Sequence, residues 1–99
     1  MTEKEELRKI AQDLIGTWIY DKTDSDEYLY AYDLYDWEKE KDLQICCIAI
    51  NPKDVTPYVQ EKEIWASEIK EYFRKLSADK GLKAWERIKS HYDKMFKGE

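Results

Sequence analysis

The sequence predicts an α+β domain, because its helix-like and strand-like segments are separated along the chain instead of alternating. Apolar residues recur with helical spacing near the N-terminus and again beyond residue 57, whereas residues 17–50 show the period-two alternation of strands. The length of 99 residues, with three glycines and two prolines, fits one folded domain spanning residues 1–99. We therefore expect an N-terminal helix, a three-stranded antiparallel meander and a C-terminal helical hairpin.

The first helix is expected over residues 3–15. Thr2 is a suitable N-cap with Glu5 three residues later, and Gly16 is a suitable stop. On a helical wheel one set of apolar side chains falls within an arc of about 140°. These residues are Leu7, Ile10, Ala11, Leu14 and Ile15. The segment is thus expected to be amphipathic and to pack on the remainder of the domain.

Three strands are expected over residues 17–22, 27–37 and 43–50, because β-branched and aromatic residues alternate there between short polar connections. The third segment is apolar on both faces, which predicts a central position in the sheet or cover on both of its sides. It contains Cys46 and Cys47. Neighbours on a strand point to opposite faces, so these cysteines are expected to be buried thiols and not a disulfide.

The remaining residues are expected to form two helices, the first beginning at Thr56-Pro57. Its apolar stripe consists of Trp65, Ile69, Tyr72, Phe73 and Leu76, and a second stripe consists of Leu82, Trp85, Ile88, Tyr92, Met95 and Phe96. On one continuous helix the two stripes would lie about 150° apart. A break near residues 79–81 and a helical hairpin are therefore expected.

The most informative feature for function is an acidic, tyrosine-rich segment between Asp21 and Asp42. It contains nine carboxylates and three lysines, a net charge of about −6, whereas the whole chain carries −5. Crowded carboxylates either remain solvated or meet a basic surface, and tyrosines supply contact area. The candidate partner-binding residues are Tyr28, Tyr30, Tyr32, Asp33, Asp36 and Glu38. Leu34 is expected on the same strand face as the three tyrosines. Because the carboxylates repel nucleic acid, we expect a protein partner or a second copy of the chain.

The last predicted helix offers an alternative site with the opposite charge. Residues 80–97 contain six basic and two acidic residues. The basic residues that share one sector of the helix are Lys80, Lys83, Arg87, Lys94 and Lys97. They could bind nucleic acid through its phosphates, complement the acidic segment, or form a solvated outer face.

No residue pattern supports catalysis, a cofactor or a metal. His91 is the only histidine, and the acidic residues between Asp21 and Glu27 lack the glycine and the distant glutamate of a calcium loop. We therefore expect no enzyme activity. The chain also lacks a run of about 20 apolar residues, and its first nine residues are charged, which predicts neither a membrane span nor a signal peptide. Abundant Glu and Lys with only four Asn and Gln residues favour a thermophilic origin.

Three stretches carry a resemblance that covers the full chain: MTEKEELRKIAQDLIGTWIY, LQICCIAINPKD and KAWERIKSHYDKMF. The chain resembles small conserved proteins of filamentous and rod-shaped viruses of hyperthermophilic archaea, the lipothrix- and rudivirus-like viruses such as Acidianus filamentous virus. The resemblance implies an archaeal host and assigns no functional residues. Because neither a signal peptide nor a membrane span is predicted, the expected location is the host cytoplasm. The leading hypothesis is a non-enzymatic viral accessory protein that binds a protein partner.

Overall fold

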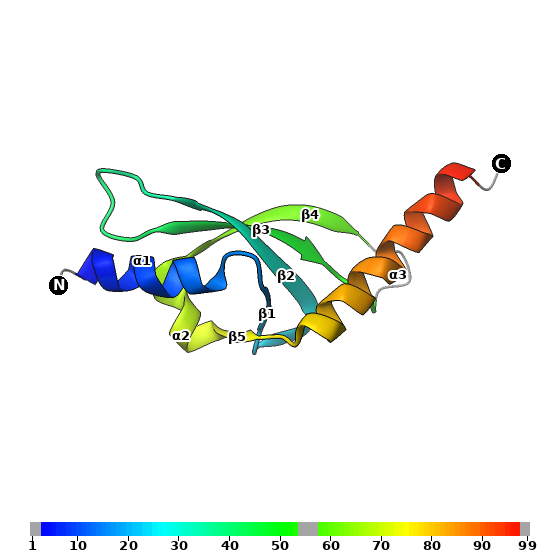
Figure 1. Cartoon of the computed structure of the whole chain (residues 1–99), viewed down its shortest axis with the longest axis horizontal. Coiled ribbons are helices and arrows are strands. Elements are labelled where there is room, and N and C mark those ends of the chain that lie inside the picture. Colours follow the sequence, from blue (N-terminus) through cyan, green and yellow to red (C-terminus); the bar gives the residue numbers. More distant parts are fainter. Residues whose placement is uncertain (1–2, 54–57, 98–99) are drawn as a thin grey trace.

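The computed structural model describes residues 3–53 and 58–97 and shows an antiparallel sheet with helices packed at its two ends (Figure 1). The elements, in chain order, are α1 (Glu3–Leu14), β1 (Trp18–Asp21), β2 (Asp24–Tyr35), β3 (Gln44–Ile50), β4 (Val59–Trp65), the 3-10 turn η1 (Ala66–Glu68), α2 (Ile69–Tyr72), β5 (Phe73–Lys75) and α3 (Ala78–Lys97). The α+β class and the N-terminal helix are confirmed. The predicted cap Thr2 and the predicted helix start Thr56-Pro57 lie outside the described residues.

Five strands of the described chain form one sheet in the order β4-β3-β2-β1-β5. Every neighbouring pair is antiparallel. The three predicted strands correspond to β1, β2 and β3, and the apolar strand β3 lies in the interior between β2 and β4, as its composition predicts. The prediction of a three-stranded meander was incomplete, because β4 and β5 extend the sheet at its two edges.

The larger part of the core lies between the sheet and α1. Ala11 and Leu14 of α1 are buried together with Ile19, Leu29 and Ile45 of the sheet, and we call this side of the sheet the α1 face. Gly16 ends the helix region with φ of 85°, a conformation that glycine adopts without strain. The amphipathic first helix predicted from the sequence is thus confirmed.

A smaller core cluster lies on the opposite side of the sheet, which we call the α3 face. Ala84 and Ile88 of α3 are buried there against Ile50, with Trp18 and Tyr28 packed around them. Figure 1 shows that α3 covers only one end of the sheet and then extends beyond it. The molecule is therefore elongated, with extents of 55 × 23 × 19 Å.

The predicted first helix of the C-terminal hairpin was wrong. Residues 59–65 form β4, which pairs with β3 from Ile50↔Val59 to Gln44↔Trp65, and residues 73–75 form β5, which pairs with β1. Between these strands α2 is only four residues long. Helical spacing of Trp65, Ile69 and Phe73 suggested one helix, but Trp65 pairs with β3 and Phe73 pairs with β1, and these backbone pairings outweigh that local preference. The C-terminal helical hairpin is replaced by strands followed by the single helix α3.

The predicted break at residues 79–81 was also wrong, because Gly81 lies inside α3. A Cβ atom at Gly81 would lie 2.2 Å from Cγ of Trp18, so the absence of a side chain allows α3 to approach β1 closely. The glycine therefore serves packing between the helix and the sheet. The break between the two apolar stripes is made instead by β5 and the two residues after it.

A bulge in β2 changes which side chains share a face. The pairing with β3 shifts between Ala31↔Cys47 and Asp33↔Cys46, so that Tyr32 is an extra residue in β2. Beyond the bulge Leu34 packs in the core on the α1 face, and Asp33 lies on the α3 face opposite Cys46. The expectation that Leu34 shares a face with Tyr28, Tyr30 and Tyr32 was therefore wrong.

Candidate binding surface on the α3 face

Helix α3 packs on one end of its sheet face, and the other end of that face lies next to the β2–β3 connection (Figure 1). We call this surface the acidic aromatic face. It consists of Tyr32, Asp33, Tyr35, Gln44, Glu61, Glu63 and Trp65 around the buried Cys46, with Trp37 just beyond the end of β2. Tyr32, Tyr35 and Trp37 are 41%, 48% and 52% exposed. Large rings exposed together in a small domain are typical of an interaction surface.

Hydrogen bonds hold the exposed ring of Trp37 in place. Its Nε1 donates to Oε1 of Gln44 at 2.7 Å, and Nε2 of Gln44 donates to Oε2 of Glu63 at 2.7 Å. The rings of Tyr35 and Trp37 also lie near each other, with centroids 6.0 Å apart. This part of the surface is therefore preorganised, which reduces the ordering entropy lost when a ligand binds.

The face is negatively charged because successive side chains of β4 point to opposite sides of the sheet, which separates its glutamates from its lysine. Glu61 and Glu63 lie on the α3 face, opposite Ile48 and Cys46. Lys62, between them, points to the other side, where its Nζ donates to Oε1 of the buried Glu27 at 2.7 Å. Since β2 and β3 contain no lysine or arginine, all charged side chains that the three strands place on this surface are carboxylates.

Two titratable groups on the face reflect this environment. Desolvation, followed by the nearby carboxylate of Glu61, raises the pKa of Tyr32. Desolvation, with the carboxylates of Glu63 and Asp33 next, raises the pKa of the Cys46 thiol. In both groups desolvation of the charged form is the larger cause, and repulsion by the nearby carboxylates adds to it.

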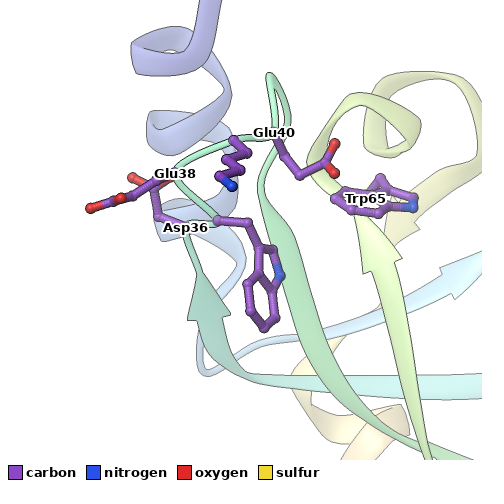
Figure 2. Close-up of a pocket in the computed structure, with 6 residues that line it drawn as sticks. Asp36, Glu38, Glu40 and Trp65 are labelled. Carbon is purple, nitrogen blue, oxygen red and sulfur yellow. The ribbon is translucent and has the colours of Figure 1, made fainter.

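At the edge of the face Trp37 and Trp65 line an open hollow of about 550 Å³ together with residues of the β2–β3 connection. The other lining residues are Asp36, Glu38, Lys39 and Glu40. Figure 2 shows Glu40 pointing toward Trp65, with Asp36 and Glu38 on the opposite side of the hollow. Aromatic rings beside carboxylates suit an amine or a guanidinium group.

An apolar groove of about 370 Å³ adjoins the face where α3 meets the sheet. Its lining residues are Trp18, Tyr30, Ile48, Leu82 and Trp85. Ile48 and Cys46 are successive residues on the same face of β3, so the groove leads directly onto the acidic aromatic face. The α3 face thus offers an apolar end and an acidic end in one continuous surface.

The structure distributes the predicted acidic site residues over three places. Tyr32 and Asp33 lie on the acidic aromatic face, whereas Tyr28 and Tyr30 are only partly exposed, because Tyr28 packs against the α3 cluster and Tyr30 lines the groove. Glu38 lies in the hollow.

Asp36 also lines the hollow, and its carboxylate forms ion pairs with Lys4 and Arg8 of α1. Hydrogen bonds from these two side chains, that from Lys4 foremost, lower the pKa of Asp36. The acidic segment is thus partly neutralised by α1 at Asp36 and by Lys62 of β4 at Glu27.

Sequence reasoning missed Glu61, Glu63 and Trp65 as surface residues because residues 57–76 were expected to be helical. The charged run Glu61-Lys62-Glu63 gives no apolar/polar alternation, so the sequence carried no clear signal of this strand. Their position beside Asp33 depends on the register of β4 against β3.

The predicted basic residues lie along α3. Lys80, Lys83, Arg87 and Lys94 are exposed, and Lys83 pairs with Asp79 of the same helix at 3.1 Å. The side chain of Lys97 lies outside the described part. Figure 1 shows the C-terminal end of α3 and the β2–β3 connection at opposite ends of the molecule. Within one chain, therefore, the end of α3 lies far from the acidic aromatic face.

Within the described residues, no group of three or more His, Cys, Asp or Glu side chains is placed to hold a metal ion. No helix of that part of the chain combines the length and the apolar character needed to cross a membrane. Searches with family models, curated proteins and solved structures found no match to this chain. The functional argument therefore depends on the surface itself.

Proposed function

We propose that this chain is a non-enzymatic viral accessory protein that binds a basic segment of a protein partner through the acidic aromatic face. The viral context comes from the sequence resemblance. The observation that supports binding is the set of three carboxylates, Asp33, Glu61 and Glu63, on a sheet surface with exposed aromatic rings and no lysine or arginine from its strands.

A basic protein segment suits this surface for two physical reasons. Carboxylates attract its cations over about 10 Å at moderate salt and so speed the encounter. Lysine and arginine side chains then gain from contact with the rings of Tyr35 and Trp37, where a cation over an aromatic face contributes about 0.5–2 kcal/mol. Nucleic acid suits the same surface poorly, since its phosphates would meet the carboxylates first.

The proposal is tested with a designed amphipathic peptide of leucine and lysine, titrated into the protein by calorimetry at 50 mM salt. We expect binding that weakens at least tenfold in the double variant Glu61→Lys/Glu63→Lys and weakens as salt is raised. A matched control, Glu6→Lys/Glu71→Lys, changes the net charge equally at two exposed positions outside the face. Equal loss of binding in the two double variants, or no binding by the wild-type protein, would contradict the proposal.

A second candidate function, nucleic-acid binding by α3, is favoured by the exposure of Lys80, Arg87 and Lys94 along the helix. It predicts retention of duplex DNA that weakens steeply with salt and is lost on charge reversal at these three residues. The same Glu61→Lys/Glu63→Lys variant separates the two functions, because it should leave retention of DNA intact or strengthen it.

A further inference from the structure

We propose that the basic segment of the partner binds as an extended strand along the outer edge of β4, with lysine or arginine at alternate positions. The inference rests on the proposed function, since it keeps the acidic aromatic face as the site and adds the conformation and the sequence pattern of the bound segment. It depends on one juxtaposition: the sheet edge that can accept a strand also carries Glu61 and Glu63.

β4 is an edge strand of the described sheet. It pairs with β3 along its whole length, from Val59 to Trp65, and no strand of the described residues lies on its other side. At seven residues it is longer than β5, the three-residue strand at the opposite edge. Val59, Glu61 and Glu63 are exposed, and Figure 1 shows β4 at the outer margin of the sheet. The backbone groups along such an edge form hydrogen bonds with an added strand.

The register of the sheet shows which residues of β4 direct their backbone groups outward. Beside the pair Gln44↔Trp65, the N–H of Ala66 donates to the carbonyl oxygen of Leu43 at 2.8 Å. Hydrogen-bonded and non-hydrogen-bonded pairs alternate in an antiparallel ladder, so the even-numbered residues of β4 exchange hydrogen bonds with β3. The N–H and C=O groups of residues 59, 61, 63 and 65 therefore point to the outer edge.

The outward-directed backbone groups belong to the residues whose side chains lie on the acidic aromatic face. A partner residue that exchanges backbone hydrogen bonds with Glu61 or Glu63 has its Cβ about 5 Å from that of the glutamate, on the same face. Lysine or arginine there forms a cross-strand ion pair. The partner residue opposite Trp65 stands beside the hollow, where Glu40 points toward Trp65 (Figure 2). Cations two residues apart in the partner thus meet successive anionic positions.

The partner residues between the cations face the other side of the sheet. One of them stands opposite Lys62, whose Nζ donates to Oε1 of the buried Glu27 at 2.7 Å. A cation at that position would be repelled by Lys62, whereas threonine or valine suits a strand and adds no charge. The edge therefore fits an alternation of cationic and neutral residues better than an unbroken basic run.

A second copy of β4 does not fit this edge. Two copies related by a two-fold axis pair antiparallel, with the same face of each sheet on the same side. A register centred on Lys62 places Glu61 opposite Glu63, and a register centred on either glutamate places that residue opposite itself. Like charges directly opposite are destabilising. The charges of β4 thus oppose pairing with its own copy and favour a foreign segment of opposite charge.

The test uses a peptide of about nine residues in which lysine and threonine alternate, titrated into the full-length protein by calorimetry at about 50 mM salt. Two derivatives carry backbone N-methyl groups, one on its lysines and the other on its threonines, so that charge and composition stay matched. The lysine N–H groups are those that face β4 in the proposed complex, while the threonine N–H groups face solvent.

We expect methylation of the lysine N–H groups to weaken binding at least tenfold, because two or more backbone hydrogen bonds are lost, and methylation of the threonine N–H groups to change it less than about twofold. Glu61→Lys/Glu63→Lys should weaken binding of the unmethylated peptide at least tenfold. The control Glu6→Lys/Glu71→Lys should weaken it much less, because both of its positions lie outside the face.

Equal affinities of the two methylated peptides would overturn the inference. If the binding of either nonetheless depends on Glu61 and Glu63, the partner binds the face in another conformation and the proposed function stands. The inference also fails, and the proposed function stands, if the protein binds the leucine and lysine peptide but not the alternating one. If neither unmethylated peptide binds, both proposals fail.

Discussion

Because α3 packs closely on Trp18 at Gly81, we predict that Gly81→Ala destabilises the protein, whereas helix propensity alone predicts that it stabilises it. In an exposed helix interior, replacing glycine by alanine stabilises a protein by about 1 kcal/mol. Gly81 lies inside α3 and does not have a positive φ, so alanine could adopt its backbone conformation. Helix propensity alone would therefore make Gly81→Ala stabilising. The structure predicts destabilisation instead.

The size of the destabilisation can be estimated from the space between Gly81 and the ring of Trp18. An added Cβ would lie 2.2, 2.4 and 2.6 Å from Cγ, Cδ1 and Cδ2 of Trp18, atoms at the base of the ring, which the side chain cannot easily move aside. A normal carbon contact is about 3.5–4.0 Å, so the ring or the helix must shift by more than about 1 Å. Overpacking costs about 1–3 kcal/mol, and moving Trp18 also weakens its contact with Tyr30, whose ring centroid lies 5.2 Å away. We expect Gly81→Ala to lower the free energy of unfolding by about 1–3 kcal/mol.

Urea denaturation followed by circular dichroism measures this change, and each kcal/mol should lower Tm by roughly 4–8 °C in a domain of this size. Two further variants separate the contact from other effects. Ser90→Ala, at an exposed position of the same helix, reports propensity alone and should be neutral or slightly stabilising. In a double-mutant cycle, Trp18→Leu should remove most of the penalty of Gly81→Ala, with a coupling of about 1 kcal/mol or more. A Gly81→Ala protein that is more stable than wild type would refute the reasoning.

Two further predictions concern pH. Burial raises the pKa of the Cys47 thiol to about 12 from its ordinary value of 9.0. Stability that is fully present below pH 9 is therefore lost as the pH rises toward 12, by up to about 1.4 kcal/mol per pH unit. Cys47→Ala should remove this part of the slope in urea titrations between pH 8 and 11, and parallel slopes for both proteins would argue against it. The pKa of Asp36 is lowered by hydrogen bonds from Lys4 and Arg8, so its stabilising effect is present above about pH 4 and is lost as the pH falls below that value. Asp36→Asn should therefore make the urea midpoint less sensitive to pH between pH 5 and 2.5, and an unchanged acid dependence would exclude the ion pairs.

Local patterns predicted those parts of the fold whose side-chain spacing is regular. The stripe from Leu7 to Leu14 predicted α1, and the apolar segment before Asn51 predicted an interior strand, because each pattern is periodic over several residues and each is buried as the pattern requires. Residues 59–75 lack such a pattern. Their strands form because β3 and β1 offer unpaired edges, and neither edge can be read from residues 59–75 alone.

The candidate surface, like the fold, could be predicted from the sequence only in part. The sequence by itself determined the acidic, aromatic character of β2 and the basic, amphipathic character of α3, since both are properties of composition and local spacing. Only the tertiary structure decided that a bulge at Tyr32 turns Asp33 and Tyr35 to the α3 face and that β4 adds Glu61 and Glu63 beside them. It also decided that α3 packs on one end of that face, whereas the acidic residues lie at the other end. The physical reason is register: a shift of one residue between strands reverses the face of every later side chain, and register is set by pairing between segments distant in the sequence.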